Sequence, residues 1–262
     1  MQDRYAGDTP DFGKYVLLWH VQSETGLRLG INWYRTRPDE VDSTRNNDGT
    51  TRHHVQLRAD FEAAAPDIYA KLRPFEKEEY RCIENIEEAD ILPTGTCFFS
   101  EFLSYGKPRC VAAQQVRQDW FCRAHKKLRD CQVIFCDPDT GPAPLYMLGK
   151  AHRKKGPKYT YPEEISSHLK SGQSVIVIRF IRQYRRGVAQ AIRDTFDLLE
   201  TQNGVPKNRS FAVEFPRGKN STYFILPAVE HEHLLRHAID VLVDNPVRRQ
   251  LFRLHSSLQS EC

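Results

Sequence analysis

The chain has 262 residues, of which 40% are hydrophobic and 11% aromatic, so it can form a sizeable core and global disorder is excluded. Its formal net charge of +4 is only mildly basic, which permits an anionic partner without requiring one. No apolar run approaches the roughly 20 residues of a membrane-spanning helix, and the start M-Q-D-R-Y-A-G-D lacks the apolar centre of a signal peptide. We therefore expect no association with a membrane.

The seven cysteines are odd in number, and no two of them have the C-x-x-C spacing. This pattern argues against a zinc site and against a disulfide framework, and it favours a reducing cytoplasm as the compartment. Cys136, directly before Asp137, is interpreted as a small buried apolar residue rather than a nucleophile.

The first third of the chain predicts an arm, a helix, a strand and a loop. Residues 1–15 mix aromatic and charged side chains, which indicates an N-terminal arm packed on the body. Asp11 is placed to cap a helix through Lys14–Gln22. A strand is expected at Leu27–Tyr34, followed by an inserted polar loop at 35–54, and polar loops of that length are generally functional or disordered.

The middle of the chain alternates helical and extended patterns. The pattern predicts a helix at Val55–Leu72, a short strand at Arg81–Ile83, a strand or helix start at Cys97–Leu103, and helices at Val111–Leu128 and Pro162–Leu169. Val133–Cys136 and Ser174–Phe180 read as buried strands. They are apolar on both faces, which suits parallel strands covered by helices.

The last third predicts a helix, a hairpin and a second helix. The helices are expected at Gly187–Glu200 and His231–Leu242, and the hairpin strands at Ser210–Phe215 and Thr222–Leu226. Residues 244–262 read as a polar helical tail. The prediction is one α/β domain, residues 1–243, with a mostly parallel three-layer sheet that ends in an antiparallel hairpin.

The loop Asp137–Gly141, D-P-D-T-G, stops the buried strand abruptly. Ligands of open α/β sheets bind outside the carboxyl ends of the strands, so Asp137 and Asp139 are candidate catalytic residues. The same residue types also form ordinary turns, and this alternative stays open.

A dense basic run, A-H-R-K-K-G-P-K-Y, follows at residues 151–159, between the two buried strands. It is either a solvated loop or a loop that contacts phosphates. Arginines after the next strand extend it, and arginine suits bidentate phosphate contact. The candidate nucleic-acid contacts are Arg153, Lys154, Lys155, Lys158, Arg179 and Arg182.

The order of elements, with its reversed strand near the end, resembles the Rossmann-like S-adenosylmethionine-dependent methyltransferases. Asp137–Gly141 lies where the amino-methyltransferases carry D-P-P-Y. The N-terminal R-Y-A-G-D-T-P-D-F-G-K-Y is similar to the H-A-G-N-x-A-D-V-x-K-H opening of the ribosomal-RNA adenine methyltransferases. It also resembles a poorly characterised family of phage- and defence-associated bacterial proteins, which begin R-Y-x-G-D-x-x-D-F-x-K-Y and carry D-P-D-N-G later.

The methyltransferase resemblance implies S-adenosylmethionine as cofactor, Lys14 as a catalytic residue near it, and Asp137 as the acceptor for the target amine of a nucleic-acid base. The residues that the resemblance places at the cofactor are Gly7, Asp8, Asp11, Asn32 and Tyr34.

The sequence departs from the methyltransferase pattern in two places. No G-x-G follows the first strand, and Asp139 and Thr140 replace the second proline and the aromatic residue of D-P-P-Y. A flipped base would then need another aromatic side chain, and Tyr5 and Tyr15 are the candidates.

Two other functions stay open. In the first, Asp137 and Asp139 gather with Asp39, Glu40 or Asp48 around magnesium or manganese in a nuclease or phosphohydrolase. In the second, the protein has no catalytic activity and binds nucleic acid or a protein partner, for example one encoded in the same defence operon.

Overall fold

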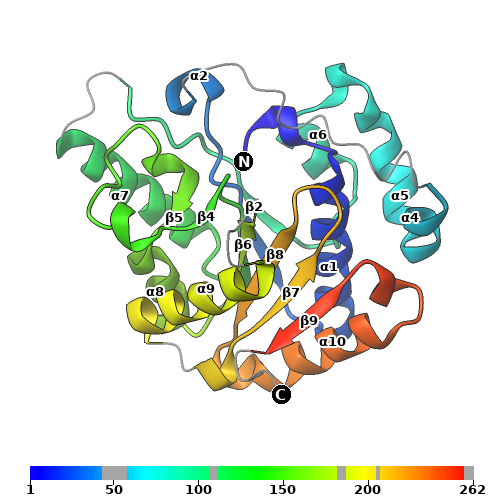
Figure 1. The fold of residues 1–262 in the computed structure, drawn as a ribbon. Helices are drawn as coiled ribbons and strands as arrows, with labels where there is room; N and C mark the ends of the chain where they lie inside the picture. The colour runs from blue at the N-terminus through cyan, green and yellow to red at the C-terminus, as the bar shows by residue number, and fades with distance from the viewer. Residues whose placement is uncertain (43–57, 107–110, 182–186, 205–206, 257–262) are drawn as a thin grey trace.

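The computed structural model describes residues 1–42, 58–106, 111–181, 187–204 and 207–256. Its centre is a seven-stranded sheet with the strand order β2-β1-β3-β6-β8-β7-β9 (Figure 1). A second, two-stranded sheet pairs β4 (Gly141–Pro142) with β5 (Tyr159–Thr160). This small sheet begins directly after the D-P-D-T loop and therefore lies beside the end of β3.

One half of the large sheet is parallel. Its strands are β1 (Leu29–Asn32), β2 (Cys97–Phe99), β3 (Val133–Cys136) and β6 (Ser174–Phe180). Every residue of β1 and β3 is buried, as expected for parallel strands that helices cover on both faces. β3 and β6 have the bounds that their apolar runs predict.

The other half is antiparallel. It contains β7 (Phe211–Phe215), β8 (Ser221–Leu226) and β9 (Arg253–Ser256). β8 lies between β6 and β7 and runs opposite to both, and β9 pairs with the free edge of β7. The predicted hairpin is therefore confirmed.

Helices cover both faces of the sheet and make three layers (Figure 1). The first face carries α1 (Thr9–Thr25), α4 (Arg58–Ala64), α5 (Pro66–Leu72), α6 (Ile83–Glu88) and α10 (Glu232–Asp244). The second face carries α7 (Val111–Lys127), α8 (Pro162–Lys170) and α9 (Val188–Asn203). A separate apolar core forms on each face, and side chains of β3 alternate between the two, with Phe135 in one and Ile134 in the other.

The N-terminal helix begins earlier than the sequence predicts. α1 starts at Thr9, and its N-cap is Asp8, whose carboxylate accepts from the backbone N–H of Asp11. The prediction that Asp11 caps the helix was wrong, because Pro10 fits the first helical turn and Asp8 supplies the acceptor before it. After β1, the short helix α2 (Pro38–Val41) occupies the start of the predicted polar loop, whose residues 43–57 lie outside the described ranges.

Three other expected elements differ. The predicted helix Val55–Leu72 is broken at Ala65, because Pro66 starts a new helix and disfavours helical backbone in the residue before it. Arg81–Ile83 was wrong as a strand, because Cys82 caps α6 through its sulfur. The described part of the tail was wrong as a helix, because Arg253–Ser256 joins the sheet as β9, and residues 257–262 lie outside the described ranges.

Within the ranges that the structure describes, no helix is both long enough and apolar enough to cross a membrane.

Candidate functional site

The D-P-D-T-G loop lies where the sheet topology predicts a ligand site. β1 pairs with β2 on one side and with β3 on the other, so chain connections leave the β1–β3 boundary in opposite directions. Such a switch point is the usual location of ligands in open α/β sheets. The Asp137 N–H, donating to the Asn32 carbonyl at 3.0 Å, joins the two strand ends at this point.

Lys14 is the centre of a buried ionic network at this point. Its Nζ lies 2.7 Å from Asp11 Oδ1 and 2.7 Å from Asp137 Oδ2, and its side chain is 1% exposed. Burial lowers the pKa of Lys14, but the two carboxylates outweigh burial and the pKa is raised. The pKa of Asp137 is raised, because burial exceeds the opposing effect of Lys14. α1 therefore presents a fixed ammonium group to the end of β3.

The N-terminal arm and the first turn of α1 position Asp11 in this network. Asp11 Oδ2 accepts from the backbone N–H of Gly7 at 2.9 Å and from the Tyr15 hydroxyl at 3.0 Å. Gly7 has φ +75°, and a Cβ there would lie 2.2 Å from Phe75 Cβ. Gly7 is therefore required by packing and backbone geometry, and its N–H orients Asp11.

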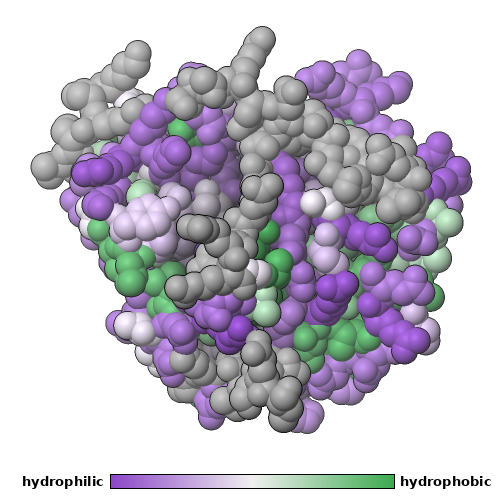
Figure 2. All heavy atoms as spheres, in the orientation of Figure 1, coloured by the Kyte–Doolittle hydropathy of each residue, from purple (hydrophilic) through white to green (hydrophobic). Residues whose placement is uncertain are grey.

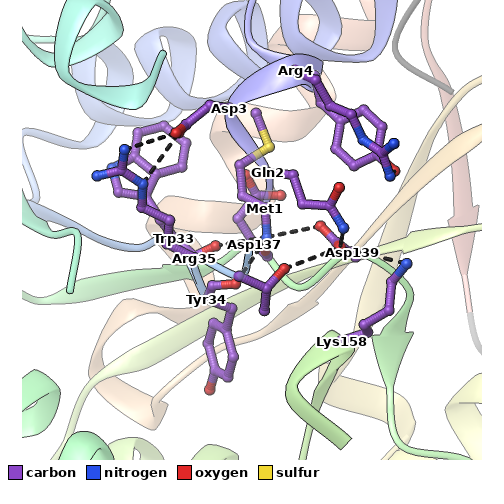
Figure 3. A network of polar contacts seen from close by, with 12 residues as sticks. Met1, Gln2, Asp3, Arg4, Trp33, Tyr34, Arg35, Asp137, Asp139 and Lys158 are labelled. Carbon is purple, nitrogen blue, oxygen red and sulfur yellow. Dashed lines mark hydrogen bonds and ion pairs between the residues drawn. The ribbon is translucent and has the colours of Figure 1, made fainter. Parts of the chain in front are cut away.

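Asp139 belongs to a second network, drawn in Figure 3. Its carboxylate lies 2.9 Å from the amino group of Met1, accepts from Gln2 Nε2 at 2.8 Å, and lies 3.6 Å from Lys158 Nζ. Burial raises the pKa of Asp139, but the Met1 amino group and Lys158 outweigh burial and the pKa is lowered. The second carboxylate of the motif thus tethers the N-terminal arm and the basic run.

Lys158 is shared between two carboxylates. Its Nζ lies 2.7 Å from Asp42 Oδ1, and Asp42 also accepts from Arg4 at 2.6 Å and from Gln2 at 3.1 Å. Gln2 Nε2 donates to both Asp42 and Asp139, so the two carboxylates hold Lys158 together. Of the predicted basic contacts that lie within the described residues, Lys158 is the one with an ion pair in this network.

A cavity of about 260 Å³ opens between α1, the D-P-D-T loop and the β7–β8 hairpin. Asp139 and Met1, which bind each other, lie on its wall. Three further carboxyl groups and three lysines line it as well. These six residues are Asp8, Asp11, Asp137, Lys14, Lys158 and Lys219. Tyr5 and Phe180 add aromatic rings. The cavity thus combines hydrogen-bonding groups, rings and cations within one space.

Asp8 is the most unusual group of the cavity. It is 3% exposed, and one carboxylate oxygen accepts the N–H of Asp11. Burial, followed by the negative charge of Asp11, raises the pKa of Asp8 to about 8. Asp8 is therefore mostly protonated at neutral pH and can donate a hydrogen bond, whereas Asp137 offers an acceptor.

Asn32 and Tyr34 do not line this cavity. Asn32 Oδ1 accepts from the N–H of Tyr34, which has φ +46°, and the Tyr34 hydroxyl donates to Glu164 at 3.0 Å on the other face of the sheet. The carbonyls of Trp33 and Tyr34 accept from the Met1 amino group, at 3.0 and 2.9 Å. The turn after β1 is therefore held by the chain's own contacts.

These contacts bear on the predicted cofactor. Trp33 and Tyr34 are fully buried, and their carbonyls already have a donor, so the backbone after β1 offers no open glycine turn. The residues present here do not fit the methionine part of S-adenosylmethionine. Its binding stays a prediction.

The basic run is anchored from beneath. Arg117 of α7 is buried, donates to the carbonyls of Gly156 and Tyr159 at 3.1 and 2.7 Å, and pairs with Glu164. Arg153 and Lys155 remain exposed on the loop. Hydrophilic side chains cover much of the face that Figure 2 shows.

Lys154 is part-exposed on this loop. The two remaining predicted nucleic-acid contacts, Arg179 and Arg182, do not belong to the loop. Arg179 is half-buried and donates to Thr195 of α9, and it is not among the residues that line the cavity. Arg182 lies outside the described residues.

The predicted metal ligands that the structure describes do not form one cluster. Asp137 binds Lys14, Asp139 binds the Met1 amino group, and Asp39 is exposed on α2, away from both. Asp48 lies outside the described residues. Among the side chains that the structure describes, no three His, Cys, Asp or Glu residues form a group that could hold a metal ion. Metal binding stays a prediction.

Two residues of the cavity were missed by the sequence reasoning. Lys219 comes from the turn between β7 and β8, and its ammonium lies 5.0 Å from the centre of the Tyr5 ring. Phe180 is the last residue of β6. The sequence P-R-G-K-N-S, which joins the two hairpin strands, contains Arg217 and Lys219 and could have indicated cations at this edge of the sheet. Of the two aromatic candidates, Tyr5 lines the cavity and Tyr15 is buried beneath it.

No protein family and no curated protein matched the chain when it was compared with both.

Proposed function

We propose that the protein binds nucleic acid and holds one base in the cavity beside Asp137. The observation that carries this proposal is the composition of the cavity wall. Carboxyl groups, aromatic rings and lysines from three different segments line one space. Proteins that take a base out of its stack read its edge by hydrogen bonds and contact its faces with aromatic or apolar side chains.

The carboxyl groups supply both polarities that a base edge requires. Asp137 carries a carboxylate that is fixed on one oxygen by Lys14. Asp8, with its pKa raised to about 8, carries a proton at neutral pH. A base that has an amino group beside a ring nitrogen or carbonyl presents a donor and an acceptor side by side. The pair is therefore suited to an amino-bearing base.

The lysines supply contacts for the phosphates on either side of that base. Lys158 comes from the basic run and Lys219 from the β7–β8 turn, so they approach the cavity from different elements. Arg153 and Lys155 continue the positive charge outward from Lys158. Phosphate contacts of this kind supply affinity and position the strand without reading its sequence.

Base methylation is a second candidate, and the sheet order favours it. β8 lies between β6 and β7 and runs opposite to both, as the reversed strand does in the Rossmann-like methyltransferases that the sequence resembles. The closed turn after β1 argues against a cofactor in that position. Calorimetry with S-adenosylmethionine tests this candidate directly, and absence of heat at millimolar cofactor removes it.

The base-binding proposal is tested with labelled single-stranded oligonucleotides and Asp137→Asn. Fluorescence anisotropy should show at least about tenfold weaker binding, because a hydrogen bond to a charged group is worth roughly 1.5–3 kcal/mol. The matched control is Asp240→Asn, an exposed carboxylate on α10, which should bind like the wild type. Circular dichroism establishes that both variants are folded.

Tyr5→Leu gives a second test, because it removes a ring of the cavity and leaves the ionic network of Lys14 in place. Folded Asp137→Asn and Tyr5→Leu variants that both bind as tightly as the wild type would refute a base in this cavity.

A further inference from the structure

An exposed apolar edge follows the D-P-D-T loop in the chain, on the short 3-10 helix η4 (Leu145–Met147). Leu145 is 68% exposed and Tyr146 is 65% exposed, although both are large apolar side chains. The helix directly follows β4, which itself follows the D-P-D-T loop. The edge is therefore close in sequence to the cavity wall.

Two neighbours of Tyr146, namely Met147 and Tyr159, are packed in the fold and restrict the position of its ring. Met147 beneath it packs with Ala143, Tyr159 and Tyr161 in a small apolar core. Burial, followed by the neighbouring Tyr146 hydroxyl, raises the pKa of Tyr159 to about 12, so the two hydroxyls lie near each other. Tyr159 pairs in β5 with Gly141 of β4, the residue after Thr140. Thr140 lines the cavity and donates its backbone N–H to the Lys158 carbonyl at 3.0 Å, so the small β4–β5 sheet connects the segment of the exposed ring to the cavity wall.

The chain segment that carries the ring is positive. From Gly141 to Pro162 the chain contains no aspartate or glutamate, and the same stretch holds five lysines and arginines: Lys150, Arg153, Lys154, Lys155 and Lys158. Lys150 donates to the carbonyl of Tyr146 at 2.5 Å. An exposed aromatic ring on a cationic segment complements a ligand that has both π-faces and phosphates.

We propose that Tyr146, flanked by Leu145, is a stacking platform for a base of single-stranded nucleic acid, next to the base that the cavity holds. This inference rests on the proposed function and names the form of its ligand. A duplex hides the faces of its bases, whereas an unpaired strand can lay one base on Tyr146 and pass its phosphates to the basic run.

The test is anisotropy with labelled single-stranded DNA and RNA of about 15 nucleotides, and with the matching duplexes, at several salt concentrations. Tyr146→Ala should weaken single-strand binding about tenfold, and Tyr146→Phe, which keeps the ring, should bind within about twofold of the wild type. Trp19→Ala is the control, since Trp19 is a 44% exposed aromatic farther along α1. It should leave binding unchanged.

The salt dependence separates stacking from charge. Tyr146→Ala should keep the wild-type slope of log K against log salt, because it removes no cation, whereas Lys155→Ala should reduce the slope. Equal binding of duplex and single strand, or an unchanged affinity in Tyr146→Ala, would overturn the platform.

The two proposals fail in different ways. If the wild type binds no nucleic acid, both are wrong. If Asp137→Asn weakens binding and Tyr146→Ala does not, the cavity stands and the platform is wrong. The reverse result supports the platform and refutes the cavity.

Discussion

At the scale of residues, the site is organised by opposite charges that have been removed from water. Lys14 binds two buried carboxylates, Asp11 and Asp137, and the amino group of Met1 and Lys158 share a third, Asp139. Removing one partner from such a network leaves a buried charge uncompensated, which costs about 3–5 kcal/mol. Asp8 is different, because burial raises its pKa to about 8, so its charge changes at a pH near neutrality.

Asp8 should make the protein less stable as the pH rises. Its pKa is raised from 3.8 to about 8 by burial first and by Asp11 second. The unfolded chain therefore releases this proton above pH 3.8, while the folded chain keeps it up to about pH 8. Between these values the folded state binds more protons, and the free energy of unfolding falls with pH by at most about 1.4 kcal/mol per unit.

Asp8→Asn should remove that fall and keep the helix cap, because asparagine also accepts from the helix N-terminus. Urea unfolding between about pH 4 and pH 8 measures the difference between variant and wild type, which should grow with pH in favour of the variant. Asp240→Asn, at an exposed position, is the control. A difference that is constant over this range would show that Asp8 titrates normally.

At the scale of elements, α1 connects the site to the sheet. Its first two turns carry Asp11 and Lys14 to the end of β3, and its body packs on the sheet in the larger core. The approach is close at Gly13, where a Cβ would lie 2.6 Å from two ring atoms of Phe215 in β7. This glycine allows α1 to lie against the antiparallel half while its start reaches the parallel half.

Gly13→Ala should therefore destabilise the protein, although alanine is favoured over glycine inside a helix by about 1 kcal/mol. Overpacking in a core typically costs about 1–3 kcal/mol, and the Phe215 ring must move. Thermal and urea unfolding measure the change. In a double-mutant cycle, Phe215→Leu should absorb part of the loss, because the smaller side chain makes room. A Gly13→Ala protein more stable than the wild type would contradict this packing.

The elements that could be predicted are those with a local cause. Val133–Cys136 and Ser174–Phe180 have the predicted bounds, because unbroken β-branched and apolar runs suit buried parallel strands. Arg253–Ser256 was wrong as a helix, because it becomes a strand only by pairing with β7, some forty residues earlier in the chain. Strand formation at an edge depends on a partner, and a local pattern does not contain it.

In the candidate site too, the residues that belong to a local motif could be predicted, and those brought in by the tertiary structure could not. Asp137 and Lys14 could be singled out from motifs, and they lie 2.7 Å apart. Lys219 could not be placed, because it reaches the cavity only through the position of the β7–β8 turn. Asn32 and Tyr34 end beside the site, yet the contacts of the N-terminal arm with the turn after β1 keep them out of the cavity.

At the scale of the whole molecule, a net charge of +4 is too small to bind nucleic acid by composition alone. What matters is where the cations lie. The stretch from Gly141 to Pro162 gathers five of them without a carboxylate, and it adjoins the carboxyl ends of the parallel strands. The basic helix end at Lys126 and Lys127 lies before β3 in the chain, and so at the opposite, amino end of that strand.

Charge reversal should therefore act on one end of the molecule only. Lys154→Glu/Lys155→Glu should weaken single-strand binding and reduce the slope of log K against log salt by about 1 to 2, since each lost phosphate contact removes roughly 0.7. Lys126→Glu/Lys127→Glu makes the same change in net charge at the opposite end of β3, so it should leave the slope unchanged. Anisotropy titrations between about 50 and 200 mM salt measure both. If the two double variants lose affinity equally, net charge and not the position of the basic run controls binding.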